Sequence, residues 1–173
     1  MALADIGVRA ASPADLDAIT GFHVRLWRDT YRDLAPPDAH AALDESRRRP
    51  GWQAKLAESG PGNRTLLAIS HNRIAGLVCL GPAGHSALQP GGDIHHLHVD
   101  PEYERRGIGR HLLALALDEL RTAGHDRAAL AVVAGNRPAR AFYRALGGVE
   151  AGRFTDPGPL WRSDNIIVQW PLH

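Results

Sequence analysis

The segment from His95 to Leu120 (HHLHVDPEYERRGIGRHLLALALDEL) constrains the fold more than any other part of this chain. It begins as an alternating strand, passes through a short basic turn containing Gly107 and Gly109, and continues as an amphipathic helix. The start of such a helix leaves backbone N–H groups without partners, and glycines let an anion approach them closely. Three arginines lie among the glycines: Arg105, Arg106 and Arg110. Because guanidinium groups add charge-assisted hydrogen bonds, the pattern predicts a cradle for a phosphorylated cofactor.

Two well-known phosphate loops do not fit this turn. A Walker A loop needs Lys-Ser or Lys-Thr after its glycines, and the dinucleotide fingerprint needs a third glycine where Leu112 stands. The turn instead resembles the acyl-CoA pyrophosphate loop of the GNAT superfamily of N-acetyltransferases, written [QR]-x-x-G-x-[GA], through the residues Glu104 to Gly109 (ERRGIG). Glu104 departs from the usual Gln or Arg. Since a carboxylate repels pyrophosphate, we expect it to point outward or to pair with a neighbouring arginine.

A second segment, Val132 to Val149 (VVAGNRPARAFYRALGGV), strengthens this resemblance. It is similar to the family's other CoA-side motif, N-x-x-A-x-x-F-Y-x-x-L-G, at six positions: Asn136, Ala139, Phe142, Tyr143, Leu146 and Gly147. The resemblance covers nearly the whole chain, loosely at the start and closely from Asp93 to Val149. It implies an α/β (α+β) GNAT fold, in which a mixed central sheet of about six to seven strands is flanked by about four helices. We expect one domain over residues 1–173.

The periodicity of the chain predicts elements that agree with this fold. The expected strands are Ile6–Ala10, Thr65–Ser70, Ile74–Leu80, Ile94–Val99, Ala128–Ala134, Val149–Phe154 and Ile166–Trp170. The expected helices run from Ser12 to about Tyr31, from Pro36 to near Leu56, from Ile108 to Leu120 and from Asn136 to Gly147. The segment Gly81–Gly92 is rich in glycine and proline and is expected to be a flexible loop. The run Arg47–Arg49 is expected to be a solvated helix face.

Bulk composition excludes several classes of partner. The chain has 20 Lys and Arg against 19 Asp and Glu, which gives a net charge of +1 and no global field for nucleic acid or acidic membranes. No stretch approaches the roughly 18 apolar residues needed to cross a bilayer. The single cysteine, Cys79, excludes an internal disulfide and fits a reducing compartment, so we expect a cytoplasmic protein.

The resemblance implies direct attack of a neutral amine on the thioester of acetyl-CoA. In the family, backbone N–H groups of the fourth strand bind the pantetheine arm and the thioester carbonyl, which here assigns Leu97, His98 and Val99. The Asn contacts the CoA arm and the Tyr protonates the departing thiolate, which assigns Asn136 and Tyr143. Asn136 could equally be a helix N-cap, and Tyr143 a core aromatic. The full expected cofactor set is Leu97, His98, Val99, Arg105, Arg106, Gly107, Ile108, Gly109, Arg110, Asn136 and Tyr143.

The sequence leaves three possibilities for the general base: Asp93, His96, or no side-chain base at all. Asp93 begins the fourth strand where several family members carry a glutamate, and it could otherwise be a strand-end cap. His96 is the second candidate, because an imidazole suits base work at neutral pH. Strict alternation would place His96 and His98 on one face of the strand and His95 on the other. Such a strand cannot direct three histidines to one ion, so we expect no metal.

The acceptor is expected to be a primary amine of a small molecule, although a polyamine, an aminoglycoside, an amino acid derivative and a protein amine all remain open. Its pocket should lie between the first two helices, the Gly81–Gly92 loop and the segment before the last strand. Candidate lining residues are Trp27, Tyr31, Trp52, Phe154 and Trp161, with Asp29, Asp33 or Asp156 to hold a cation. Each aromatic could instead be ordinary core. The alternative function is a non-catalytic acyl-CoA-binding or regulatory module. Dimers are frequent in the family, so a homodimer is a further expectation.

Overall fold

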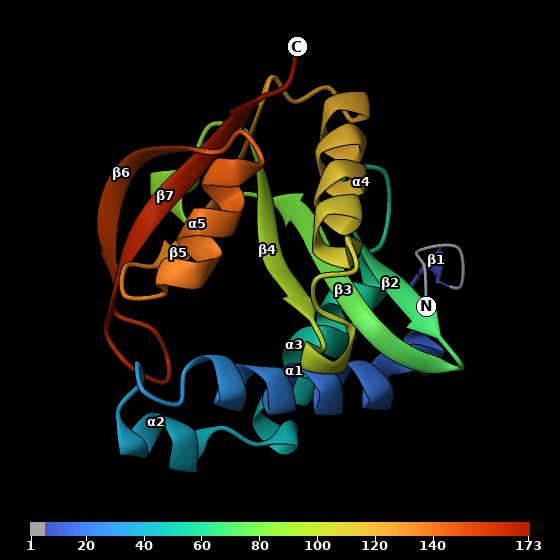
Figure 1. Ribbon diagram of the computed structural model, residues 1–173, viewed down its shortest axis with the longest axis vertical. Helices are drawn as coiled ribbons and strands as arrows, with labels where there is room; N and C mark the ends of the chain where they lie inside the picture. The colour runs from blue at the N-terminus through green and yellow to red at the C-terminus, as the bar shows by residue number, and fades with distance from the viewer. Residues whose placement is uncertain (1–5) are drawn as a thin grey trace.

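The computed structural model describes residues 6–173 and contains a seven-stranded sheet with the order β1-β2-β3-β4-β5-β7-β6 (Figure 1). The strands are β1 Gly7–Ala10, β2 Arg64–Ser70, β3 Arg73–Pro82, β4 Gly92–Val99, β5 Arg127–Val133, β6 Val149–Asp156 and β7 Ser163–Pro171. Among them β4 and β5 form the parallel pair, and every other neighbouring pair is antiparallel. The predicted mixed α/β sheet is therefore confirmed.

Five α-helices accompany the described strands: α1 Leu16–Thr30, α2 Pro37–Ala42, α3 Glu45–Ala57, α4 Ile108–Thr122 and α5 Arg137–Ala145. The single helix expected from Pro36 to Leu56 is wrong, because the chain divides it between α2 and α3. Leu43 adopts an extended conformation with a fully buried side chain, and Asp44 then caps α3 by accepting a hydrogen bond from the Arg47 N–H at 2.8 Å.

The helices cover both faces of the sheet. Leu112, Leu120 and other apolar residues of α4 pack with Tyr143 of α5 against one face, while Ile19 and Leu26 of α1 pack with α3 against the other. In Figure 1, α4 and α5 lie in front of the strands and α1 crosses below them. The edge of β4 that faces β5 therefore lies between two helical layers, one of α4 and α5 and the other of α1 and α3.

The segment from 81 to 92 is more regular than the flexible loop we expected. Its first two residues extend β3, and Ser86–Leu88 forms a short 3₁₀ helix, η3. Leu88 is buried against Ala129 and Ile167, so this segment covers the part of β5 and β7 that no helix reaches. None of the helices within residues 6–173 has the length and apolar character needed to cross a bilayer.

Candidate functional site

A cleft opens where β4 and β5 part. The two strands pair only at Gly92 with Ala128 and at Asp93 with Ala129, and they diverge beyond that point (Figure 1). A cavity of about 1170 Å³ lies in this region, lined by the backbone from Ile94 to Val99 on one side and by Leu130–Val132 on the other. Because the β5-facing edge of β4 is unpaired there, alternate backbone N–H groups are directed into the cavity.

A β-bulge at His95 sets which side chains of β4 face the cavity. Ile94 pairs with Leu80 and His96 pairs with Cys79, so His95 is an extra residue without a partner on β3. The strict alternation expected for this strand is therefore wrong at His95. Its ring lies on the α3 side, where Nδ1 is 2.8 Å from Lys55 Nζ and Nε2 is 2.8 Å from the Pro82 carbonyl oxygen.

Asp93 belongs to the same network of polar contacts as His95. Its carboxylate accepts a hydrogen bond from the Gly84 N–H at 3.0 Å and lies 3.6 Å from Nε2 of His95. Burial raises the pKa of Asp93, and burial together with the Lys55 charge lowers the pKa of His95. Asp93 is not among the residues that line the cavity, whereas His95, which its carboxylate approaches, is one of them.

The basic turn and the start of α4 form one end of the cavity. Gly107 is the N-cap of α4 with a left-handed φ of +82°, which glycine adopts without strain. An ideal Cβ on Gly109 would lie 3.1 Å from Cζ of Phe142, so glycine permits the close approach of α4 to α5. The free N–H groups of the first turn and the positive end of the helix dipole together favour an anion.

The predicted cofactor residues divide between lining and supporting positions. Ten of them line the cavity, namely Leu97, His98, Val99, Arg105, Gly107, Ile108, Gly109, Arg110, Asn136 and Tyr143. Arg106 does not, because its guanidinium lies over the Tyr103 ring at 5.3 Å. Glu104 is exposed and forms no ion pair with another residue of the described range, which agrees with the first of its two expected placements, a side chain that points outward.

Asn136 and Tyr143 are placed by α5 at the β5 side of the cavity. Asn136 is the N-cap of α5 and accepts a hydrogen bond from the Ala139 N–H at 3.3 Å, while also lining the cavity. Capping and a ligand contact are thus compatible. Tyr143 is 8% exposed, packs edge-on against Trp170, and reaches the cavity. Burial raises the pKa of its hydroxyl, so the group is protonated at neutral pH and can donate a proton.

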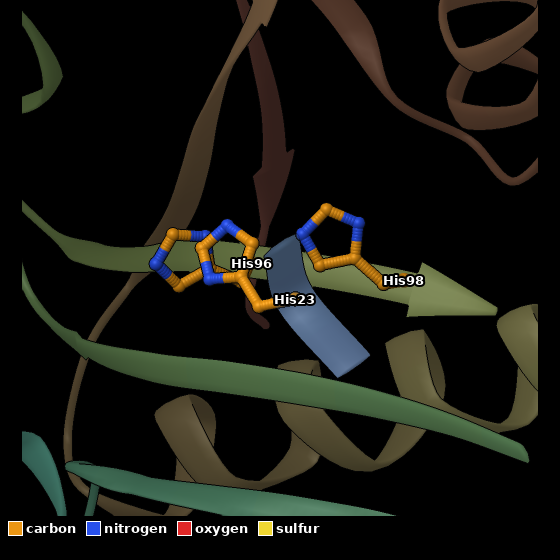
Figure 2. Close-up of side chains that lie close together, drawn as sticks. All are labelled: His23, His96 and His98. Carbon is orange, nitrogen blue, oxygen red and sulfur yellow. The ribbon is translucent and has the colours of Figure 1, made fainter. Parts of the chain in front are cut away.

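Three imidazoles among the residues that line the cavity lie close together (Figure 2). His96 and His98 project from β4, and His23 of α1 lies beside both, with ring centroids 4.6 and 5.1 Å away. One nitrogen of each ring lies within 4.8 Å of the others. Nδ1 of His23 accepts a hydrogen bond from Trp52 Nε1–H at 2.9 Å, whereas the buried Nε2 of His98 has no partner among the described residues.

These imidazoles are neutral at physiological pH. Burial lowers the pKa of His23 to about 2 and that of His98 to about 4, and it holds the pKa of His96 well below 6.5. Neutral imidazoles keep a lone pair with which they can accept a proton. Sequence analysis missed His23, although its position between Ile19 and Leu26 on the apolar face of the first helix was a signal of burial.

The acceptor end combines these histidines with parts of α1 and α3. Of the residues expected there, Trp27, Asp29 and Tyr31 line the cavity. The other five do not: Asp33, Trp52, Phe154, Asp156 and Trp161. Trp52 instead supports His23, and Phe154 stacks on His85 with ring centroids 4.4 Å apart.

We expect this histidine cluster to make the fold sensitive to acid. In the unfolded chain an imidazole takes up a proton with a pKa near 6.5, whereas the folded-state pKa is about 2 for His23 and about 4 for His98. The unfolded state therefore binds more protons below pH 6.5, and stability present above that pH is lost as pH falls. The loss is roughly 1 kcal/mol per pH unit for each imidazole, and circular dichroism melts between pH 7 and 4 would measure it.

The matched control for this acid sensitivity is His23→Asn. Its amide oxygen can still accept the Trp52 Nε1–H, but it carries no titratable group. The variant should lose stability less steeply below pH 6.5 than the parent chain. Equal slopes would mean that His23 is not a source of the acid sensitivity.

Residues 24–147 match the acetyltransferase (GNAT) family. The mycothiol acetyltransferase of Clavibacter sepedonicus is 39% identical over 84 residues, which are 49% of this chain and 26% of that protein. The [ribosomal protein bS18]-alanine N-acetyltransferase of Escherichia coli (strain K12) is 40% identical over 81 residues, which are 46% of this chain and 55% of that protein. The matches therefore span about half or less of these curated relatives.

Solved structures share the fold at low sequence identity. The PaiA N-acetyltransferase of Thermoplasma acidophilum, solved with coenzyme A, has a TM-score of 0.77 at 18% identity, and the match covers 96% of this chain and 98% of that one. A putative acetyltransferase of Salmonella typhimurium, solved with acetyl-CoA, has a TM-score of 0.70 at 20% identity and covers 97% and 94%. These structures share the fold of this chain, and the family match over most of its length shows that the chain belongs to the GNAT family of acetyltransferases.

Proposed function

We propose that this chain transfers the acetyl group of acetyl-CoA to a primary amine of a small molecule by direct attack within a ternary complex. One observation carries the proposal: a single cavity joins an anion-binding helix start, an unpaired strand edge and a buried tyrosine to a cluster of neutral imidazoles. Two related solved structures hold coenzyme A and acetyl-CoA, which supports the choice of acyl donor.

The residues present fit acetyl-CoA as a substrate. The pyrophosphate would lie on the free N–H groups at the start of α4, between Arg105 and Arg110. The pantetheine arm would run along the unpaired edge of β4, with Asn136 at its side. Acetyl-CoA supplies an acetyl group as a thioester, and the donors available to its carbonyl oxygen are the backbone N–H groups among Leu97, His98 and Val99 that lie on the unpaired edge of β4. Such preorganised donors stabilise the oxyanion that forms when the amine attacks.

The protons move through two side chains at opposite walls of the cavity. As the amine nitrogen bonds to the carbonyl carbon, His96 accepts the proton released from nitrogen. The carbon–sulfur bond then breaks, and the sulfur takes the proton of the Tyr143 hydroxyl. Solvent returns a proton from His96 to Tyr143, so the balance is amine plus thioester giving amide plus thiol.

A shift in melting temperature tests the donor. Saturating acetyl-CoA at about 100 times its dissociation constant adds about 2.7 kcal/mol to the free energy of unfolding, or about 5–10 °C for a domain of this size. AMP at the same concentration is the control for a general anion effect and should shift the melting temperature far less. No shift with acetyl-CoA, or an equal shift with AMP, would contradict acetyl-CoA binding in the cleft between β4 and β5.

The histidine cluster also has the composition of a transition-metal site, since imidazole is a common zinc ligand. We propose that its three rings instead act as neutral proton acceptors and that transfer needs no metal. The rate of thiol release should therefore be unchanged after dialysis against EDTA. A rate that is lost on dialysis and restored by Zn²⁺ would assign the cluster to a metal and remove His96 as the base.

A further inference from the structure

Arg48 of α3 lies inside the acceptor end of the cavity, beside His23, His98 and Tyr31. Its positive charge contributes to the lowered pKa of both histidines and opposes the rise in the pKa of the tyrosine hydroxyl. The expectation that Arg47–Arg49 form a solvated helix face is therefore wrong for Arg48. Arg47 and Arg49 are exposed, but Arg48 points the other way and is half-buried.

Arg48 has no internal partner for its charge. Its Nε atom is buried without a hydrogen bond, and no carboxylate oxygen within residues 6–173 lies within 4.0 Å of its guanidinium nitrogens. Other arginines nearby differ: Arg25 pairs with Asp100, Arg28 donates to the Leu43 carbonyl, and Arg49 pairs with Asp17. Removing a guanidinium from water without a partner is unfavourable, and burial accordingly lowers the pKa of Arg48.

The other charges around the cavity do not compensate for Arg48. Two carboxylates belong to its lining, Asp29 and Glu104. Asp29 is ion-paired with Arg32 at 3.0 Å, and Glu104 lies at the rim with the basic turn. The end that contains the histidines is therefore positive, and it is flanked by the aromatic side chains of Trp27 and Tyr31.

We infer that Arg48 binds an anionic group carried by the amine acceptor, which makes the substrate class an amine that also bears a carboxylate. The planar guanidinium matches a carboxylate with two parallel hydrogen bonds. The carboxylate of the acceptor thus supplies the ion-pair partner that Arg48 lacks among residues 6–173, while the amine of the acceptor lies at the histidine cluster. This inference rests on the proposed function and narrows the acceptor. It favours amino acid derivatives over polyamines and aminoglycosides, whose positive charges Arg48 repels.

The first test compares a carboxylate acceptor with its neutral amide in two enzymes. The rate of thiol release from acetyl-CoA is measured with L-phenylalanine and with L-phenylalaninamide, and kcat/KM is obtained for each. The ratio of acid to amide should fall tenfold or more in Arg48→Gln relative to the parent. The different amine pKa values of the two acceptors cancel, because the same ratio is taken in both enzymes.

Two further variants separate recognition from folding. Arg47→Gln removes the same charge from the exposed neighbouring position and should leave the ratio unchanged. Arg48→Lys keeps the charge without the planar fork and should retain part of the preference. A ratio that is the same in the parent and in Arg48→Gln overturns the inference. So does an equal loss in Arg47→Gln, because that would indicate a general charge effect.

A binding measurement gives a result even if neither acceptor is acetylated. The protein is first saturated with coenzyme A, which occupies the basic turn, and phenylacetate or phenylacetamide is then added during thermal melts. We expect phenylacetate to raise the melting temperature of the parent and of Arg47→Gln but not of Arg48→Gln, with no rise for phenylacetamide. Inorganic phosphate is a third arm: a rise that depends on Arg48 with phosphate alone supports the anion subsite and changes the group to a phosphate.

The two failures can be told apart. If acetyl transfer to amines proceeds while phenylacetate and phosphate raise no melting temperature, the Arg48 subsite is overturned and the proposed function stands. If phenylacetate binds through Arg48 but no amine is acetylated, the subsite stands and acetyl transfer fails.

Discussion

Tyr143→Phe is expected to lower kcat for acetyl transfer by about 10²-fold or more, while the dissociation constant of acetyl-CoA changes by less than about twofold. The Tyr143 ring is held by Phe142 and Trp170, so phenylalanine preserves the packing of α5 on β7. Only the hydroxyl is lost, and that group is the one we propose as the proton donor to the departing thiolate. Rates are measured by thiol release, and affinity is measured by calorimetric titration.

Tyr103→Phe is the matched control for this experiment. Tyr103 also lines the cavity and is also 8% exposed, but it lies at the basic turn beneath Arg106 and not on α5. Its loss of a hydroxyl should leave kcat within about twofold of the parent. A Tyr143→Phe variant with parental kcat would exclude this residue as the general acid.

His96→Phe is expected to lower kcat/KM at pH 7 by about 10²-fold, because the amine loses the imidazole that accepts its proton. Phenylalanine is chosen because the ring of His96 packs between His23 and Trp52, at 4.6 and 5.2 Å between centroids. The deficit should shrink as the pH rises, since hydroxide can then take the proton released from nitrogen in place of the imidazole. Initial rates from pH 6.5 to 10 measure this recovery.

His111→Phe supplies the control, because His111 is an exposed residue of α4 outside the cavity lining. It should show the parental pH profile. A His96→Phe deficit that stays constant at all pH values would instead indicate damage to substrate positioning. That outcome would remove the proton-accepting role of His96.

The parent chain, measured in the same assays, also decides between catalysis and the alternative of a non-catalytic acyl-CoA-binding module. A module of that kind would bind acetyl-CoA and show no amine-dependent thiol release in the parent chain. The family match makes an enzyme the appropriate starting point, and Glu104 at the rim of the basic turn is the feature that keeps the alternative worth testing.

Local sequence patterns were enough to predict the end of the cleft formed by the basic turn and the starts of α4 and α5, because the requirements of these elements are local. A glycine with positive φ at the start of α4, a close approach at Gly109, and the N-cap at Asn136 each depend on residues within one or two turns of helix. The strand and helix order follows from periodicity over similar lengths. Two ordered motifs were therefore enough to predict the mixed sheet and the basic turn.

The end of the cavity that holds the histidines depends on contacts between distant segments. The bulge at His95 arises from pairing with β3 and places that ring on the α3 side of β4, beside Lys55, which alternation along one strand does not predict. His23 and Arg48 reach the cavity because α1 and α3 pack over the face of β4 that carries His96 and His98, although these residues are far apart in the chain. Charge and burial at such a point are properties of packing between distant segments, and a pattern read along one segment carries no information about them.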